Sequence, residues 1–204
     1  YEKTLQEYIA AMEYSGDFAF GRFNLGNLYA TLGQPQRAVE NFKAAIQIDD
    51  QTYPAKVNLA MLHAQMGRNG EAETLLREVV TAFPELYDVQ YSLGLLLAEE
   101  KKYVEAEAHL ATAARGIPDG PRVHFNLGLL YDYLGKDQQA EAALSRAVAL
   151  ESNNLDYLQA LARHYLKRGD IASADRLADQ MIAHHPEDRN ALALKKFIRG
   201  KMAN

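Results

Sequence analysis

The chain has 204 residues, of which 48% are hydrophobic and 24% charged, with a formal net charge of −5. This composition is typical of a folded chain with a buried core, and the acidic balance without a basic run argues against nucleic acid and anionic membranes as partners. Cysteine is absent, which excludes disulfides and thiolate sites and leaves cytoplasm and periplasm both compatible. No stretch reaches the about 18 consecutive apolar residues of a membrane span, so direct membrane insertion is not expected.

A repeat of 34 residues organises the chain. Leucine recurs on this period, each time before Gly or Ala, at Leu25, Leu59, Leu93, Leu127 and Leu161. Alanine recurs on the same period at Ala38, Ala72, Ala106, Ala140 and Ala174. Because no insertion or deletion interrupts the register, repetition is the main feature of the predicted fold. The predicted repeats are residues 19–52, 53–86, 87–120, 121–154 and 155–188.

The predicted elements begin with a partial repeat over residues 1–18. Tyr8 and Ala11 fall on second-helix positions of the register, so only a second helix is expected there. The chain starts at Tyr1 with neither a signal peptide nor an initiator methionine, and we expect it to be a fragment of a longer protein.

Each full repeat is predicted to be a hairpin of two amphipathic helices. In the first repeat, Leu25, Leu28 and Leu32 have the spacing of one helix, and Phe42 and Ile46 have that of a second. Small residues at repeat positions 8 and 20 allow the two helices to cross closely. The glycines predicted to end the first helices in the left-handed conformation are Gly33, Gly67, Gly135 and Gly169.

The last predicted element is a C-terminal capping helix over residues 189–204. Its apolar residues Leu192, Leu194 and Ile198 lie among basic ones. Such a helix gives an open repeat array a polar end.

The repeat pattern resembles that of the tetratricopeptide repeat (TPR) family. The Leu-Gly-x-x-Tyr and Ala-x-x-x-Phe segments of that family occur in the first repeat, ending at Tyr29 and Phe42. Proline occupies position 32 in three repeats, at Pro84, Pro118 and Pro186. The resemblance implies an all-α fold, a right-handed superhelical solenoid of antiparallel helix pairs, here one TPR domain over residues 1–204.

Two departures from the family pattern bear on packing. The third repeat has Lys101 where the others have the turn glycine, which puts a tight turn there in doubt. The family usually places a bulky aromatic at position 4, and weaker packing between some repeats is expected without it. This chain has Arg22, Lys56, Gln90, His124 and Leu158 at that position.

No residue pattern indicates an enzyme. The six histidines show no metal-ligand spacing, and the adjacent His184 and His185 lie near a helix end, where solvated imidazoles are ordinary. Phosphate-binding glycine loops and the Gly-x-Ser-x-Gly motif are absent, since the glycines follow the repeat register. We expect no catalytic residue, no metal site and no cofactor.

The resemblance places a peptide-binding groove on the first helices, at repeat positions 2, 5, 6, 9, 12 and 13. Position 5 carries a row of apolar side chains and position 6 a row of asparagines, which suits an extended peptide because each carboxamide offers a donor and an acceptor. Asparagine at position 6 is also common in TPR sequences irrespective of ligand, so a structural role stays open. The candidate groove residues are Phe23, Asn24, Asn27, Val57, Asn58, Tyr91, Phe125, Asn126, Arg163 and Lys167.

The charges of the predicted groove indicate which ligands fit. Arg163 and Lys167 form its basic pair, and the acidic residues Asp132 and Asp156 are opposed to them. This mixture is typical first of a solvated salt-bridge network and second of an anchor for a ligand carboxylate. The two-carboxylate clamp of chaperone-binding TPR proteins needs basic residues where this chain has Phe23, Asp88 and Ser92, so a C-terminal EEVD peptide is not expected to bind.

The sequence thus predicts a non-enzymatic protein-binding scaffold whose partner is a peptide or protein segment, not nucleic acid. The alternative is an assembly or docking domain of a larger bacterial enzyme or multihaem electron-transfer protein, although no haem motif is present. The partial first repeat further predicts a weak homodimer through the N-terminal end, because Leu5, Ile9 and Met12 lack a covering helix.

Overall fold

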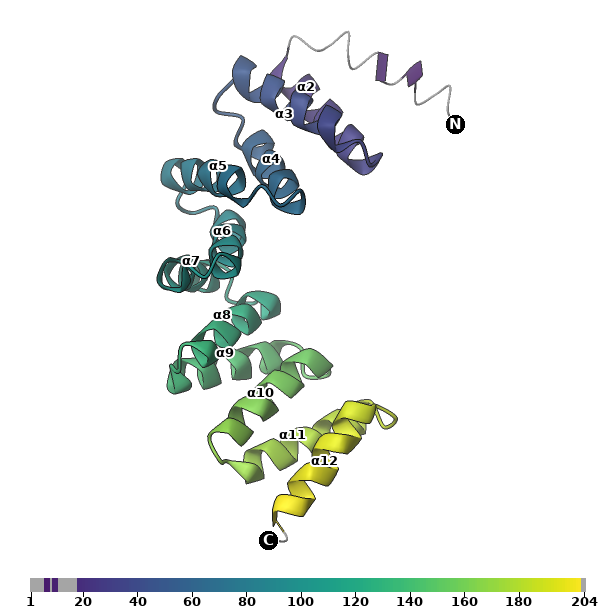
Figure 1. Ribbon diagram of the computed structural model, residues 1–204, viewed down its shortest axis with the longest axis vertical. Helices are drawn as coiled ribbons and strands as arrows, with labels where there is room; N and C mark the ends of the chain where they lie inside the picture. Colours follow the sequence, from purple (N-terminus) through teal and green to yellow (C-terminus); the bar gives the residue numbers. More distant parts are fainter. Residues whose placement is uncertain (1–5, 8, 11–17, 203–204) are drawn as a thin grey trace. The chain divides into compact units, whose positions relative to one another are not determined.

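The computed structural model describes residues 6–7, 9–10 and 18–202. All regular structure in this part of the chain is α-helical (Figure 1). None of the described helices is long and apolar enough to cross a membrane. The helices are α2 (Ala19–Thr31), α3 (Pro35–Ile48), α4 (Tyr53–Gln65), α5 (Asn69–Ala82), α6 (Tyr87–Glu99), α7 (Tyr103–Gly116), α8 (Pro121–Tyr133), α9 (Asp137–Leu150), α10 (Leu155–Lys167), α11 (Ile171–His184) and α12 (Arg189–Met202).

The helices keep the period of the sequence. The even-numbered helices each begin at the first position of the register, at Ala19, Tyr53, Tyr87, Pro121, Leu155 and Arg189. The odd-numbered helices from α3 to α11 also begin 34 residues apart. The fold is therefore an all-α array of helix pairs, which confirms the predicted fold class.

Two compact units divide the chain, unit 1 over Tyr1–Glu100 and unit 2 over Lys101–Asn204. Unit 1 holds α2 to α6 and unit 2 holds α7 to α12. Within each unit, every helix packs against the next one along the chain. The boundary falls between the two helices of the third predicted repeat, and the predicted single TPR domain over residues 1–204 stays a prediction.

The core of unit 1 forms where the apolar faces of α2, α3 and α4 meet. Leu25 and Phe42 are buried in it. Ile9, among the described N-terminal residues, is half-buried against this core. The other two residues of the predicted dimer contact, Leu5 and Met12, lie outside the described residues, so the homodimer stays a prediction.

Glycine is required where the two helices of the first repeat cross, and also in the fourth repeat. A Cβ atom at Gly26 would lie 2.5 Å from Cδ1 of Phe42, and one at Gly128 would lie 2.8 Å from Cγ of Leu144. Carbon atoms do not approach this closely without displacing a neighbour. Position 8 therefore lies at the helix crossing, as the sequence predicts.

The turns between paired helices are all tight, including the one that lacks glycine. Gly33, Gly67, Gly135 and Gly169 have φ values of 68°, 73°, 70° and 78°. Lys101 has a φ of 62° and makes the same left-handed turn at a steric cost that glycine avoids. The doubt that the sequence raised about this turn was wrong, because Lys101 itself adopts the left-handed conformation.

Polar residues at position 4 bond to the turn that precedes their helix. In unit 1, Gln90 Nε2 donates to the carbonyl oxygen of Pro84 at 3.0 Å. In unit 2, His124 Nε2 lies 3.0 Å from the carbonyl oxygen of Pro118. These hydrogen bonds satisfy turn carbonyls at the junction between repeats, a role that the family's usual aromatic side chain does not have.

The core of unit 2 continues to its last helix. Leu158 and Met181 are buried between α9, α10 and α11. Ile198 of α12 is buried against α11, whereas Leu192 is exposed. Ile198 therefore joins α12 to the core of unit 2, and Leu192 does not.

A buried histidine lies in unit 1 at a position that is tyrosine in three repeats. His63 is 3% exposed, and its Nδ1 is buried with no hydrogen-bond partner among the described residues. It borders a cavity of about 400 Å³ between α3, α4 and α5. Burial lowers the pKa of His63 below its usual value; Arg68 and Lys43 add to this, while Glu71 opposes it.

Unit 1 is therefore expected to lose stability as the pH falls below about 6.5, the ordinary histidine pKa. In that range the unfolded chain binds a proton that folded His63 does not, so the loss is at most about 1.4 kcal/mol per pH unit from this group and vanishes above pH 6.5. Urea unfolding at pH 7.5 and 5.5 measures it. His63→Leu should remove this part of the loss, and His184→Leu, at an exposed histidine, should not. Equal losses in the parent and His63→Leu would contradict the prediction.

Candidate functional site

We define the first-helix face as the side chains at repeat positions 2, 5, 6, 9, 12 and 13 of the even-numbered helices. In unit 1 it comprises side chains of α2, α4 and α6, and α2 contacts α4. In unit 2 it comprises side chains of α8 and α10, which also contact each other. The face carries all ten candidate residues.

Two predicted groove amides in unit 1 bond to each other. Asn58 Nδ2 on α4 donates to Asn27 Oδ1 on α2 at 2.6 Å, and both side chains are half-buried. The bond orients both carboxamides and links neighbouring repeats. It uses one donor of Asn58 and one acceptor of Asn27, so the amide hydrogens of Asn27 and the carbonyl oxygen of Asn58 keep their bonding capacity.

The apolar row of unit 1 is partly core and partly surface. Phe23, Val57 and Tyr91 are all half-buried. The ring of Phe23 lies between those of Phe20 and Phe42, with both centroid distances 6.2 Å. Phe20, at position 2 of its repeat, is 70% exposed. Phe23 therefore anchors the row to the core, and Phe20 presents more aromatic surface than any of the three predicted residues.

A small cavity opens on the first-helix face between α4 and α6. Its volume is about 220 Å³, and its walls are mainly apolar. Met61, 50% exposed, lies beside it. Apart from Ser92, the residues around this cavity were not predicted, although positions 9, 12 and 13 of the same register contain most of them. The lining residues are Ala60, Met61, Ala64, Gln65, Leu76, Ser92, Leu95, Leu96 and Glu99.

In unit 2 the predicted apolar and amide residues are half-buried. Phe125 packs its ring against that of the buried Tyr157 at a centroid distance of 4.7 Å, so it contributes to the core as well as to the face. Asn126 lies beside it on α8. Tyr133, at position 13, is 68% exposed and was not predicted.

The two basic residues of the predicted groove in unit 2, Arg163 and Lys167, have different surroundings. Lys167 Nζ donates to the backbone oxygen of Asp132 at 2.8 Å and lies 3.4 Å from its carboxylate. Arg163 is exposed and makes no ion pair within the described ranges. Burial acts to raise the pKa of Asp132. The hydrogen bond from His164 and the charge of Lys167 act against it more strongly, so the pKa of Asp132 is lowered below its usual value. The salt-bridge interpretation therefore fits Lys167.

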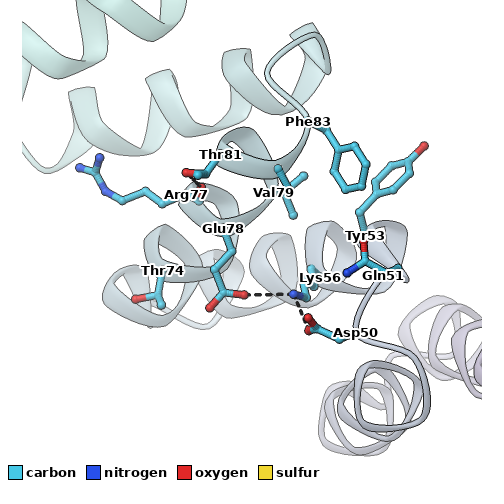
Figure 2. A pocket seen from close by; sticks show the side chains of 11 residues that line it. Asp50, Gln51, Tyr53, Lys56, Thr74, Arg77, Glu78, Val79, Thr81 and Phe83 are labelled. Carbon is cyan, nitrogen blue, oxygen red and sulfur yellow. Dashed lines mark hydrogen bonds and ion pairs between the residues drawn. The ribbon is translucent and has the colours of Figure 1, made fainter.

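A larger cavity lies away from the predicted groove. Its volume is about 790 Å³. Figure 2 shows side chains that line it, from α5, the start of α4 and the turn before α4. Lys56 lies between Asp50 and Glu78, at 2.7 and 3.2 Å. The hydrogen bond to Asp50 raises the pKa of Lys56 despite burial. Because the charges here are paired internally, the cavity offers a ligand no unpaired charged group.

Helix pairs that begin every 34 residues, cross at glycine or alanine and turn through a left-handed residue define a helical-hairpin repeat protein. The chain belongs to the tetratricopeptide repeat family. Sequence models of this family match residues 57–121, residues 19–52 and 121–154, and residues 160–180. No curated protein matches the chain.

Solved structures similar to this chain are TPR proteins. YrrB, described as a TPR protein with an unusual peptide-binding site, is 20% identical over 92% of this chain and 96% of its own, with a TM-score of 0.78. MamA from Desulfovibrio magneticus RS-1 is 20% identical over 84% and 97%, with a TM-score of 0.76. PilF from Pseudomonas aeruginosa is 22% identical over 91% and 84%, with a TM-score of 0.75. These similarities show the fold.

Proposed function

We propose that the chain is a non-enzymatic protein-interaction scaffold that binds an extended segment of another protein on the first-helix face of unit 1. The observation that carries this proposal is the bonded pair Asn27 and Asn58 on the same face as the cavity beside Met61. The peptide-binding site named for YrrB, a protein of the same fold, supports it.

The chemistry of this face suits a peptide backbone flanked by an apolar side chain. The oriented amides of Asn27 and Asn58 offer donors and an acceptor to a peptide group whatever the side chains of the ligand are. The cavity of about 220 Å³ has room for one aliphatic side chain of the ligand. Affinity would then come from the amides and selectivity from the cavity.

Asn58→Ala is expected to weaken such a peptide by about 1 to 3 kcal/mol, or roughly 5- to 150-fold, because buried peptide groups lose a partner. Met61→Lys should weaken it independently by placing a charge beside the apolar cavity. Peptides selected from a random display library against the parent chain, with affinities measured by fluorescence anisotropy, provide the test. Gln36→Ala, at an exposed amide on α3, is the matched control. Selected peptides that bind both variants like the parent would contradict the proposal.

The predicted groove residues of unit 2, Phe125, Asn126, Arg163 and Lys167, extend the proposal to that unit. Arg163, exposed and without an ion pair in the described part of the chain, is the residue of this set that suits an anchor for a ligand carboxylate. The alternative role as a docking domain of a larger protein has no separate observation in its favour and stays a prediction.

A further inference from the structure

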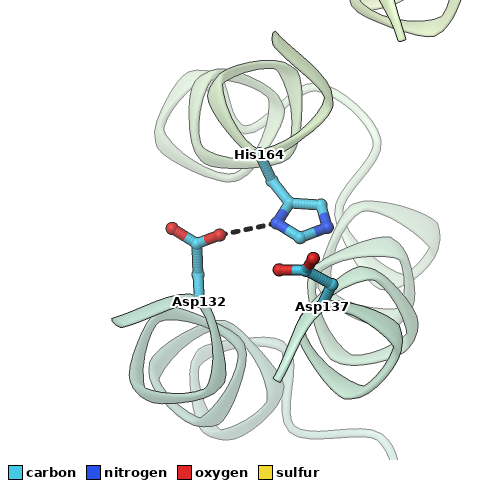
Figure 3. Close-up of side chains that lie close together, drawn as sticks. All are labelled: Asp132, Asp137 and His164. Carbon is cyan, nitrogen blue, oxygen red and sulfur yellow. Dashed lines mark hydrogen bonds and ion pairs between the residues drawn. The ribbon is translucent and has the colours of Figure 1, made fainter. Parts of the chain in front are cut away.

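Three side chains that commonly bind metals converge within unit 2 (Figure 3). Asp132 lies near the end of α8, Asp137 is the first residue of α9, and His164 lies on α10. One ligand atom from each side chain lies within 4.8 Å of the other two. In Figure 3 both carboxylates lie close to the His164 ring, with Asp132 facing Nδ1.

Two of these three residues, His164 and Asp132, depart from what the other repeats place at the same positions. His164 occupies position 10, which the other four repeats fill with Leu28, Leu62, Leu96 and Leu130. Asp132 occupies position 12, which is alanine in the first three repeats and leucine in the fifth. The fold itself therefore does not need a histidine or an aspartate here, since apolar residues build the same helix crossing four times.

The histidine is costly to bury and gains a single polar contact. Its exposed fraction is 1%, and its Nε2 is buried with no partner among the described residues. Its Nδ1 lies 2.6 Å from Asp132 Oδ1. An unpartnered buried nitrogen opposes folding, so leucine would fit position 10 better if packing were all that mattered. The ring nitrogen of His164 that faces a polar group is Nδ1, which lies opposite Asp132, so Nδ1 is the atom available as a ligand.

The charges around the cluster suit a cation. Asp132 and Asp137 carry two negative charges, and Lys167 Nζ, 3.4 Å from Asp132 Oδ1, balances one of them. Lys167 is exposed, and its ammonium also bonds to the backbone oxygen of Asp132. It can therefore move away from the carboxylate and still be hydrogen-bonded to that oxygen or to water. The nearby Lys136 and Arg168 are paired with Glu107 and Glu141 instead.

We propose that Asp132, Asp137 and His164 together bind one divalent metal ion of the zinc class. An imidazole nitrogen with two carboxylate oxygens is a borderline donor set that suits Zn²⁺ better than Mg²⁺ or Ca²⁺, which prefer oxygen ligands alone. Three protein ligands leave a fourth tetrahedral position for water. The ion would replace the hydrogen bond between His164 and Asp132 and join α8, α9 and α10 across a repeat junction.

The test uses the whole chain, freed of metal with a chelator and titrated with ZnCl₂ by calorimetry. The expected result is one Zn²⁺ per chain and a thermal midpoint raised by about 5 °C or more at a Zn²⁺ concentration a hundredfold above Kd. Asp137→Asn should weaken Zn²⁺ at least tenfold without changing the metal-free melt, because Asp137 is exposed. Asp156→Asn, at an exposed aspartate on α10, is the control and should bind like the parent.

His164→Leu restores the residue of the other four repeats, so this variant is expected to fold at least as stably as the parent without metal and to lose Zn²⁺ binding. Co²⁺ substituted into the parent should give a visible absorption band that this variant lacks. No binding by the parent would overturn the proposal. Zn²⁺ bound equally well by His164→Leu and Asp137→Asn would also overturn it, because the ion would then lie elsewhere, as at His184 and His185. Ca²⁺ bound as tightly as Zn²⁺, and unaffected by His164→Leu, would contradict the role of the histidine.

Discussion

Gly128→Leu is expected to destabilise unit 2 by about 3 kcal/mol, at the upper end of overpacking effects. A Cβ atom at this position would lie 2.8 Å from Leu144 Cγ and 3.0 Å from the backbone nitrogen of Leu144. The side chain of Leu144 is fully buried and the backbone of α9 is fixed by its own hydrogen bonds, so neither can withdraw without opening the core. The helices α8 and α9 would have to separate.

Urea unfolding followed by helical circular dichroism measures this effect, through a lower midpoint. Gly70→Leu is the matched control, because Gly70 is also helical and a Cβ atom there meets nothing within 4 Å. It should change the midpoint little. If Gly128→Leu unfolded at the same urea midpoint as the parent, Gly128 would not lie at the helix crossing. The register assigned to the fourth repeat would then be wrong.

Gly26→Ala is expected to destabilise unit 1 by about 2 kcal/mol, although it adds a single methyl group. That methyl carbon would lie 2.5 Å from Cδ1 and Cε1 of Phe42. The Phe42 ring is 1% exposed and packs against Phe23, so it has no free space to rotate into. The residues at positions 8 and 24 of the first repeat are therefore matched in size: Gly26 has no side chain, and Phe42 is the largest residue that any repeat has at position 24.

The second repeat shows that alanine at position 8 fits when position 24 carries a smaller residue, because it combines Ala60 with Leu76. Phe42→Leu in the Gly26→Ala background should therefore recover part of the lost stability. A double-mutant cycle measured by urea unfolding should give a favourable coupling of about 1 kcal/mol or more between the two sites. Additive effects of the two substitutions would show that Gly26 and Phe42 do not restrict each other.

The repeat, its bounds and the small residues at the helix crossings could all be predicted from the sequence. These features are local and periodic: apolar spacing sets each helix, small residues set the crossing, and a turn glycine such as Gly33 sets the connection. Because the same residue types recur at the same positions in all five repeats, each repeat is an independent check on the register assigned to the others. The resemblance to the family rested on the residues that recur in this register, and it implied the all-α fold.

The contacts between side chains of neighbouring repeats could not be predicted from the sequence and are known only from the packed structure. Lys101 has a φ of 62° and makes a left-handed turn, a conformation that a residue with a Cβ atom disfavours. Asn27 bonds to Asn58 across 31 residues, and His164 meets Asp132 across 32. These separations form no sequence motif, because the distance between two repeats depends on how their helices pack. The candidate peptide site and the proposed metal site therefore both appear only when neighbouring repeats are packed together.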